Sequence, residues 1–469
     1  MLRVGVGLPA QGSPTSGVRA LIDLLTTEAL VTNAPDGRQS ERIATSWTWN
    51  PDRTVLRLVL RKDVFFHDGT LVTPEHVAES FKRSVKRKEA FSYASVVDVS
   101  VSGPDTVDIK LAEPNSFLLP DLSLTSLRMA QRPEIGTGPF KLIQSGDHSE
   151  LEAFDKYYRG RPALKTVEVD FYPTQRKAWA GMLRGELGML YEVSHEAVNF
   201  VEAETTIRTY SFPRSYYIPF VFNVRHPVLR NVEVRRALNE ALDRSTLIAD
   251  GLRGRGKVAD GPIWPEHWAY SNTPGFTFNP DAARLRLDKA GFPVRPAVNG
   301  AMPSRFSINC MVVNDSRFER LALLMQRQLY DVGVDLRLTP VTVDGFRERV
   351  GKGDFDSFLV EMAGRSLSWV YAFWHSPAAN TPALTNSGYT AGDRILDDIR
   401  RAYSDDDIRR GVADLMRVFH DDPPAAFLTW QVTSRAVSTG YDVSAEPDRD
   451  ILANVWQWRA APPLQQAAR

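Results

Sequence analysis

Alternating apolar and polar positions in the first part of the chain predict an antiparallel, half-exposed sheet. Residues 54–61 carry leucine at every second position, with arginines between them, which is the period of a strand with one buried face. Residues 103–114 begin with a turn and then place Val107, Ile109 and Leu111 on one side. Two such strands so close in sequence favour an antiparallel pairing.

A helix is predicted between these two strands. Asp68 and Gly69 form a turn signal, Thr73 is a favourable N-cap, and Pro74 suits the first helical position. The apolar stripe of this helix consists of Val77, Phe81 and Val85. Its basic run, residues 82–88, could suggest nucleic-acid binding. We interpret the run as a solvated face, because no second basic stretch and no stacking aromatic residues accompany it.

Later segments change to a β-α-β pattern. Residues 167–193 and 306–341 each show strand, helix and strand in succession, and Gly333 is expected to end the second helix. Residues 355–362 form a continuous apolar run, as expected for a strand covered on both faces. Repeated β-α-β units predict parallel or mixed sheets with helices on both sides, and therefore an α/β fold.

Length and charge narrow the class of protein. The chain has 469 residues, of which 43% are hydrophobic and 24% charged, and Lys+Arg and Asp+Glu both total 57. This length fits two or three lobes, and the charge balance argues against a nucleic-acid or membrane-surface role. No apolar run approaches the roughly 18 residues of a membrane span. The first residues also lack a signal-peptide core, so we expect a cytoplasmic protein or a chain without its signal.

The sequence offers few reactive groups. Cys310 is the only cysteine, so an internal disulfide is impossible, and its strand-like surroundings favour a buried, inert thiol. The eight histidines show no metal-ligand spacing, and no nucleophile-elbow motif is present. We therefore expect no metal, no cofactor and no enzymatic activity.

The stretch GLRGRGKV, residues 251–258, resembles the start of a phosphate-binding loop but lacks its context. Val258 stands where such loops need Ser or Thr, a helical pattern precedes the stretch, and Pro262 and Pro265 follow it. We predict no nucleotide site and interpret Gly251 as a helix C-terminal glycine.

Several stretches together resemble one known family. They are EALVTNAPDGRQSERIATSWTWNPDRTVLRLVLRKDVFFHDGTLVTPEHV, GTGPFKLI, FNVRHPVLRNVEVRRALNEALDR, GPIWPEHW, DAARLRLDKAGF and NSGYTAGDRILDDI. In this order they resemble the peptide- and nickel-type solute-binding proteins of ABC importers. In that family a glycine-rich turn and a Pro-rich segment follow the helix after the FN element, which accounts for GLRGRGKV.

The resemblance implies a periplasmic-binding-protein fold of type II, with two α/β lobes around a ligand cleft. Lobe I would comprise residues 1–224 and 431–469, with an inserted subdomain at about 37–150, and lobe II residues 225–430. A hinge is expected near Asn223–Arg225 and Trp430–Thr433, and closure over ligand requires contacts from both lobes.

Matching positions to the family suggests which residues contact a ligand, although each also has a plain structural alternative. The loop from Ser13 to Gly17 would be a backbone-binding loop or a surface turn. Tyr93 would be a cleft or core tyrosine, and Trp430 a ligand contact or hinge packing. The full set of expected ligand-binding residues is Ser13, Thr15, Ser16, Gly17, Tyr93, Tyr216, Tyr217, Met362, Arg365, Trp369, Asn386, Tyr389 and Trp430.

The most informative position departs from the family pattern. Peptide binders of the family carry a G-W-x-x-D segment whose aspartate pairs with the ligand's ammonium. Here Met362 takes the tryptophan position and Arg365 the aspartate position. An arginine would repel an ammonium and suits a carboxylate or phosphate instead. The alternative is that Arg365 pairs with Glu361, four residues earlier. The aromatic residues that follow suit either ligand stacking or core packing.

These observations favour an exported, monomeric receptor that passes a short peptide or a similar solute to an ABC permease. It would lie in the periplasm or outside the cell, held to the membrane only by a lipid anchor that this sequence lacks. The alternative is the ligand-sensing domain of a transcription regulator, although no DNA-binding segment is evident. A hydrolase using the cleft is a third and weaker hypothesis.

Overall fold

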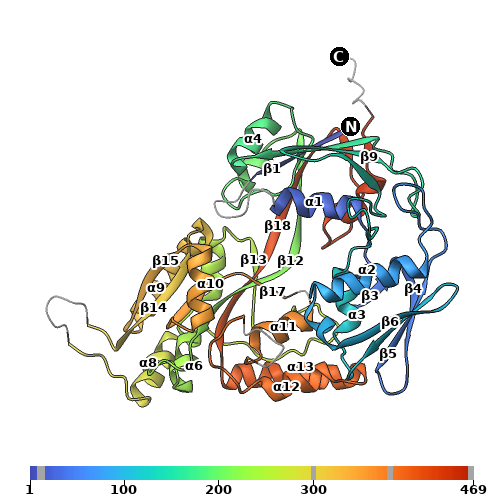
Figure 1. Cartoon of the computed structure of the whole chain (residues 1–469). Helices are drawn as coiled ribbons and strands as arrows, with labels where there is room; N and C mark the ends of the chain where they lie inside the picture. The colour runs from blue at the N-terminus through green and yellow to red at the C-terminus, as the bar shows by residue number, and fades with distance from the viewer. Residues whose placement is uncertain (8–15, 297–302, 365, 378–383, 463–469) are drawn as a thin grey trace. The chain divides into compact units, whose positions relative to one another are not determined.

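The computed structural model describes residues 1–7, 16–296, 303–364, 366–377 and 384–462, and the fold is an α/β arrangement of two compact units (Figure 1). Unit 1 comprises Met1–Pro213 and Thr433–Arg469, and unit 2 comprises Arg214–Val432. The chain passes between the units inside two long strands, β12 (Ile207–Phe222) and β18 (Ala425–Ser438). The lobe boundaries expected from the resemblance fall after residues 224 and 430.

Unit 1 is built on a mixed sheet in which β1 (Leu2–Gly7) is central. It pairs in parallel with β10 (Thr166–Tyr172) and β11 (Met189–Leu190), so the β-α-β unit predicted at 167–193 is confirmed. The antiparallel strands β9 (His148–Ala153) and β8 (Phe140–Gln144) extend the sheet beyond β10. A separate two-stranded sheet pairs β19 (Tyr441–Asp442) with β20 (Arg459–Ala460). The helices of this part of unit 1 are α1 (Ser16–Thr26), α4 (Gln175–Leu183), α5 (Val198–Glu202) and η4 (Ile451–Gln457).

A four-stranded antiparallel sheet in unit 1 confirms the first sequence pattern. Its order is β4-β5-β7-β6, and α2 (Pro74–Lys86) packs on β6 and β7. Leu56, Leu58 and Leu60 are buried and Arg57 is exposed, as the alternation predicts. The remaining elements are β2 (Val31–Asn33), β3 (Gln39–Glu41), β4 (Ala44–Trp49), β5 (Val55–Leu60), η1 (Phe91–Ser95), β6 (Val96–Gly103), β7 (Thr106–Leu111), α3 (Leu118–Asp121) and η2 (Leu122–Leu124).

Helix α2 begins as the sequence predicts. Thr73 is its N-cap, and the Thr73 N–H donates to His76 Nδ1 at 3.2 Å. Val77 and Phe81 are buried against the sheet, each 1% exposed. This helix therefore has an apolar face that fixes its position on the subdomain, and its other faces remain for polar side chains.

Unit 2 contains the second predicted β-α-β unit. β14 (Phe306–Val313) pairs in parallel with β15 (Val334–Val341) on one side and with β16 (Ser357–Leu359) on the other. The connecting helix α9 (Ser316–Asp331) ends two residues before Gly333, whose φ of +84° confirms the predicted glycine terminus. The unit also contains α6 (Val232–Glu240), α7 (Arg244–Thr246), η3 (Leu247–Gly251), β13 (Gly256–Val258), α8 (Pro280–Lys289), α10 (Val343–Lys352), β17 (Met362–Ala363), α11 (Leu367–Trp374), α12 (Asp393–Arg400) and α13 (Asp405–Asp421).

The apolar run at 355–362, predicted as one strand, forms two short strands instead. β16 pairs with β12 between Leu359 and Phe220, and β17 pairs with it between Met362 and Tyr217. The register is the same in both ladders, so the interruption faces Pro219 of β12. Proline has no N–H to donate to a ladder, and the pairing breaks at this position.

The glycine-rich stretch at 251–258 leads into a strand, unlike a phosphate-binding loop. After η3, Arg253 and Gly254 adopt positive φ angles of 52° and 75°, and β13 then pairs with β18, placing Lys257 opposite Trp430. Gly251 ends the helical turn as predicted, but the reason is close packing: an added Cβ would lie 2.7 Å from the Leu321 side chain.

Candidate functional site

A cluster of buried aromatic side chains in unit 2 contains two of the predicted site residues. Tyr217 on β12 and Trp430 on β18 are fully buried, with ring centroids 5.0 Å apart. Trp374 of α11 donates from its indole Nε1 to the Tyr217 hydroxyl at 2.9 Å, and burial raises the pKa of Tyr217. Trp264 completes this side of the cluster, 5.2 Å from Trp430. The structure thus brings Tyr217 and Trp430 together.

The buried indole N–H of Trp430 lacks an acceptor among the residues that the structure describes, as do those of Trp456 and Trp458. The Trp430 ring lies against Gly364, where an added Cβ would come within 2.7 Å of it. A buried N–H without a partner costs about 1–3 kcal/mol, so this donor can gain energy from any acceptor that reaches it. Gly364 is a position where only glycine fits without displacement of the ring.

Beside the aromatic cluster lies a group of charged side chains, here termed the Glu361 cluster: Arg214, Asp315, Arg317 and Glu361. The Glu361 carboxylate, whose side chain is 16% exposed, is 3.4 Å from Arg317 Nη1 and 3.9 Å from Arg214 Nη1. Arg317 also donates twice to Asp315, each time at 3.1 Å. The Glu361 carboxylate therefore has two guanidinium partners in the described part of the chain.

Three further predicted residues lie on the elements next to this cluster. Tyr216 on β12 is half-buried, and the Arg214 guanidinium lies 4.3 Å from its ring centroid. Met362 on β17 is 2% exposed and pairs with Tyr217 in the ladder. Trp369 on α11 is half-buried and stacks on Phe373, with ring centroids 5.7 Å apart. The partly exposed rings of Tyr216 and Trp369 can pack against a bound molecule.

Asn386 and Tyr389 have internal hydrogen-bond partners. Asn386 has a φ of 40°, and its side-chain amide donates to the carbonyls of Val350 and Gly351, each at 3.0 Å. Tyr389 is 4% exposed and donates to the Asp422 carbonyl at 2.8 Å, while burial raises its pKa. These contacts fix the loop that carries the two residues.

Tyr93 lies in unit 1, inside the core of the inserted subdomain. It is 1% exposed, its hydroxyl donates to the Asp121 carbonyl at 2.9 Å, and it also contacts the Thr125 hydroxyl. Burial raises its pKa. Its ring packs edge-on against Phe81, with centroids 5.0 Å apart. These contacts match the core alternative that the sequence left open for Tyr93.

The predicted N-terminal binding loop differs from expectation where it can be described. Helix α1 begins at Ser16, so Gly17 is helical, and an added Cβ on Gly17 would lie 3.0 Å from Val6. Ser13 and Thr15 lie outside the described residues, as does Arg365, and the side chain of Ser16 is not described either.

Sequence reasoning did not identify Arg214, Arg317 and Gly364. Arg214 stands two residues before Tyr216 in the printed sequence, which was the only available signal. Arg317 is far from Glu361 along the chain and is brought to it by the parallel packing of β14 beside β16. Neither the residue types nor their spacing indicates that contact.

The described residues contain neither a metal-binding cluster nor a membrane-spanning helix. No group of three or more His, Cys, Asp or Glu side chains there could hold a metal ion. No helix in the described ranges has the length and apolar character needed to cross a membrane.

Comparison with known proteins agrees with the fold and the sequence motifs. The oligopeptide-binding protein AppA of Bacillus subtilis is 24% identical over 438 residues, covering 85% of this chain and 79% of AppA. The dipeptide-binding protein of Escherichia coli is 22% identical over 364 residues, covering 69% of this chain and 67% of that protein.

Solved structures match over almost the whole chain. NikA from Brucella suis in complex with Fe(III)-EDTA gives a TM-score of 0.85 at 19% identity, covering 98% of this chain and 100% of that one. AppA from Bacillus subtilis, in complex with a nonapeptide, gives 0.78 at 21% identity, covering 98% and 99%. The predicted periplasmic-binding-protein fold is thereby confirmed. Since the family model for bacterial extracellular solute-binding proteins, family 5, matches residues 39–383, the chain belongs to that family.

Proposed function

We propose that this family member captures a short peptide or a similar small solute and delivers it to an ABC permease. We further propose that the solute presents an anionic or neutral group, such as a blocked amino end, to the region of β17 and α11. The binding surface in unit 2 would include Tyr216, Trp369 and Trp430, together with Arg365.

The observation that carries the proposal is the state of Glu361. β12, β17 and α11 contain no Asp or Glu, and Glu361 directly precedes β17. Its carboxylate already lies near two guanidinium groups, at 3.4 and 3.9 Å. A peptide ammonium needs a carboxylate whose charge is not yet neutralised. The surroundings of β17 therefore favour a ligand without a free ammonium at this place.

The aromatic residues support the rest of the proposal. Tyr216 and Trp369 present partly exposed rings, which can cover an apolar or planar portion of a solute. The buried indole N–H of Trp430, which lacks an acceptor in the described structure, would suit a solute carbonyl or carboxylate. Two similar structures hold different ligands, one a nonapeptide and the other Fe(III)-EDTA, so one fold accommodates solutes of different chemistry.

The test is calorimetry with matched peptides. Short peptides with free and N-acetylated amino ends are titrated into the wild type and into Arg365→Asp. We expect the wild type to prefer the acetylated peptides and Arg365→Asp to shift toward the free amines. If Arg365 meets a buried ligand carboxylate, Arg365→Ala loses about 2–5 kcal/mol of affinity; if it only forms a solvated ion pair, it loses about 0.5 kcal/mol.

Arg347→Asp is the matched control, because Arg347 forms an exposed pair with Asp344 on α10. Its preference should equal that of the wild type. Tight binding of free-amine peptides by the wild type, in preference to acetylated ones, would refute the proposal. Mass spectrometry of molecules that co-purify with the protein gives an independent readout of ligand class.

Several finer expectations stay predictions. They are a monomeric state, a lipid anchor, and hinge closure near Asn223–Arg225 and Trp430–Thr433, which would lower the radius of gyration on ligand binding. The family consists of binding proteins, and the relatives described above give the transcription-regulator alternative no support.

A further inference from the structure

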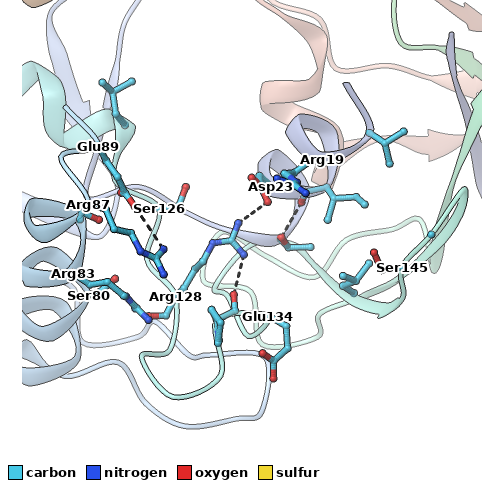
Figure 2. Close-up of a pocket in the computed structure, with 18 of the residues that line it drawn as sticks. Arg19, Asp23, Ser80, Arg83, Arg87, Glu89, Ser126, Arg128, Glu134 and Ser145 are labelled. Atoms are coloured by element: carbon cyan, nitrogen blue, oxygen red, sulfur yellow. Dashed lines mark hydrogen bonds and ion pairs between the residues drawn. The ribbon is translucent and has the colours of Figure 1, made fainter. Parts of the chain in front are cut away.

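Unit 1 contains a hollow of about 1030 Å³ between α1 and α2. Figure 2 shows Ser80, Arg83 and Arg87 on the α2 side, Arg19 and Asp23 on the α1 side, and Arg128 between them. Its volume is at the upper end of the range of pockets that hold small molecules, roughly 300–1,000 Å³. A seam that served only packing would be lined by apolar side chains, whereas this one is lined largely by polar groups.

The lining follows one stripe of α2 and its C-terminus. Ser80, Arg83, Ser84 and Arg87 occupy positions i, i+3, i+4 and i+7 and all line the hollow, so they lie on one face of the helix. The sequence predicts that the basic run at 82–88 is a solvated face. Lys82 and Arg87 are exposed, as that prediction expects, and Arg87 lies 3.9 Å from Glu89. Arg83 is half-buried and lines the hollow instead.

Arg83 is held in a fixed orientation without losing its charge. Its guanidinium donates to the backbone carbonyls of Ala130 and Arg128, at 2.9 and 3.0 Å. No carboxylate of the described chain lies within ion-pair distance of it. Carbonyl partners orient the side chain but leave its positive charge uncompensated. Further N–H donors of the guanidinium remain available to a ligand. A fixed guanidinium is pre-organised for an oxyanion.

The serines of the stripe and an arginine of the opposite wall add hydrogen-bond donors to the hollow. Ser80 and Ser84 are 3% and 4% exposed, and both line the hollow. A hydroxyl that lines a hollow can donate to an oxyanion there. On the opposite wall, Arg19 has no ion-pair partner among the described residues. These donors all line one hollow.

Acidic residues restrict the size of the ligand. Asp23 pairs with Arg128 at 2.6 Å, and Glu134 and Asp147 are exposed where they line the hollow. They would repel an extended polyanion such as a nucleic acid. We propose that this hollow binds one small oxyanion, a carboxylate or a phosphate, through Arg83, Arg19 and the hydroxyls of Ser80 and Ser84. This site is separate from the proposed solute site in unit 2 and does not rest on it.

The test uses the full chain with inorganic phosphate and with citrate, at an ionic strength held constant with sodium chloride. We expect saturable binding by calorimetry, and a rise in Tm beyond that given by chloride, because a ligand that binds only the native state stabilises it. Tighter binding of phosphate identifies a phosphate site, and tighter binding of citrate identifies a carboxylate site.

Variants decide where the anion binds. Arg83→Gln, Arg19→Gln and Ser84→Ala should each weaken binding at least about fivefold, whereas Lys82→Gln, on the exposed side of α2, should leave it unchanged. Arg19→Gln removes no described contact, so it remains informative if Arg83→Gln fails to fold. Protection no greater than that of chloride, or equal loss in Lys82→Gln, would overturn the assignment.

Discussion

The Glu361 cluster of unit 2 and the residues Arg83 and His67 of unit 1 show two ways of holding a basic side chain. In unit 2, Arg317 and Arg214 lie near the Glu361 carboxylate, at 3.4 and 3.9 Å. In unit 1, Arg83 donates to two backbone carbonyls, and His67 Nε2 lies 3.1 Å from the Gly138 carbonyl. A carboxylate neutralises its partner, whereas a carbonyl only orients it. The first arrangement neutralises charge within the fold. The second leaves the charge of Arg83 uncompensated and makes protonation of His67 unfavourable.

The largest effect is expected at Glu361. Replacing Glu361 with Gln removes the carboxylate that Arg214 and Arg317 share, although Arg317 keeps its hydrogen bonds to Asp315. Removing one partner of a buried pair costs about 3–5 kcal/mol, and partial exposure reduces this, so we expect a loss of about 2–3 kcal/mol in the free energy of unfolding. Urea denaturation measures it. In an Arg317→Met background Glu361→Gln should cost less than in the wild type, and a double-mutant cycle without coupling would contradict the arrangement.

His67 tests the carbonyl arrangement through pH. Burial is the main cause that lowers its pKa from 6.5 to about 4. Between these values the unfolded chain binds more protons than the folded one, so stability falls as pH falls through this window. Between pH 7 and pH 5 we expect His67 to contribute a loss of about 2 kcal/mol.

His67→Gln, which keeps a donor for the Gly138 carbonyl, should remove that part of the pH dependence in denaturation at the two pH values. His148→Gln is the comparison variant. The pKa of His148 is raised, chiefly by its hydrogen bond to Asp170, so its effect on the pH dependence has the opposite sign to that of His67. An unchanged slope in His67→Gln would show that other groups cause it.

The smallest effect is expected at Lys257, which belongs to neither arrangement. Its exposed ammonium pairs with Glu266 at 2.9 Å and lies 5.1 Å from the Trp264 ring centroid. Lys257→Ala should change stability by no more than about 0.5 kcal/mol, as exposed ion pairs contribute little. Solute affinity should also stay the same. If the wild type binds ATP saturably and this substitution abolishes the binding, the prediction of no nucleotide site at 251–258 is wrong.

The sequence by itself determined the elements and the family. The alternation at 54–61, the cap at Thr73 and the glycine at 333 predict local structure, because strand period, capping and positive φ depend on residues a few positions apart. The family followed from motifs spread along most of the chain. The predicted strand at 355–362 was wrong in its continuity, because the interruption comes from Pro219, which lies on a neighbouring strand.

Only the tertiary structure decided which polar groups have partners. Glu361 is near Arg317 because β14 packs beside β16, and Arg83 lines a hollow because α2 lies beside the segment at 128–130. Neither contact can be inferred from the spacing of the residues along the chain. Burial likewise separates Tyr216 from the adjacent Tyr217, since successive strand residues face opposite sides. A charge or a ring acquires its role from what surrounds it in space, and the sequence order does not state those surroundings.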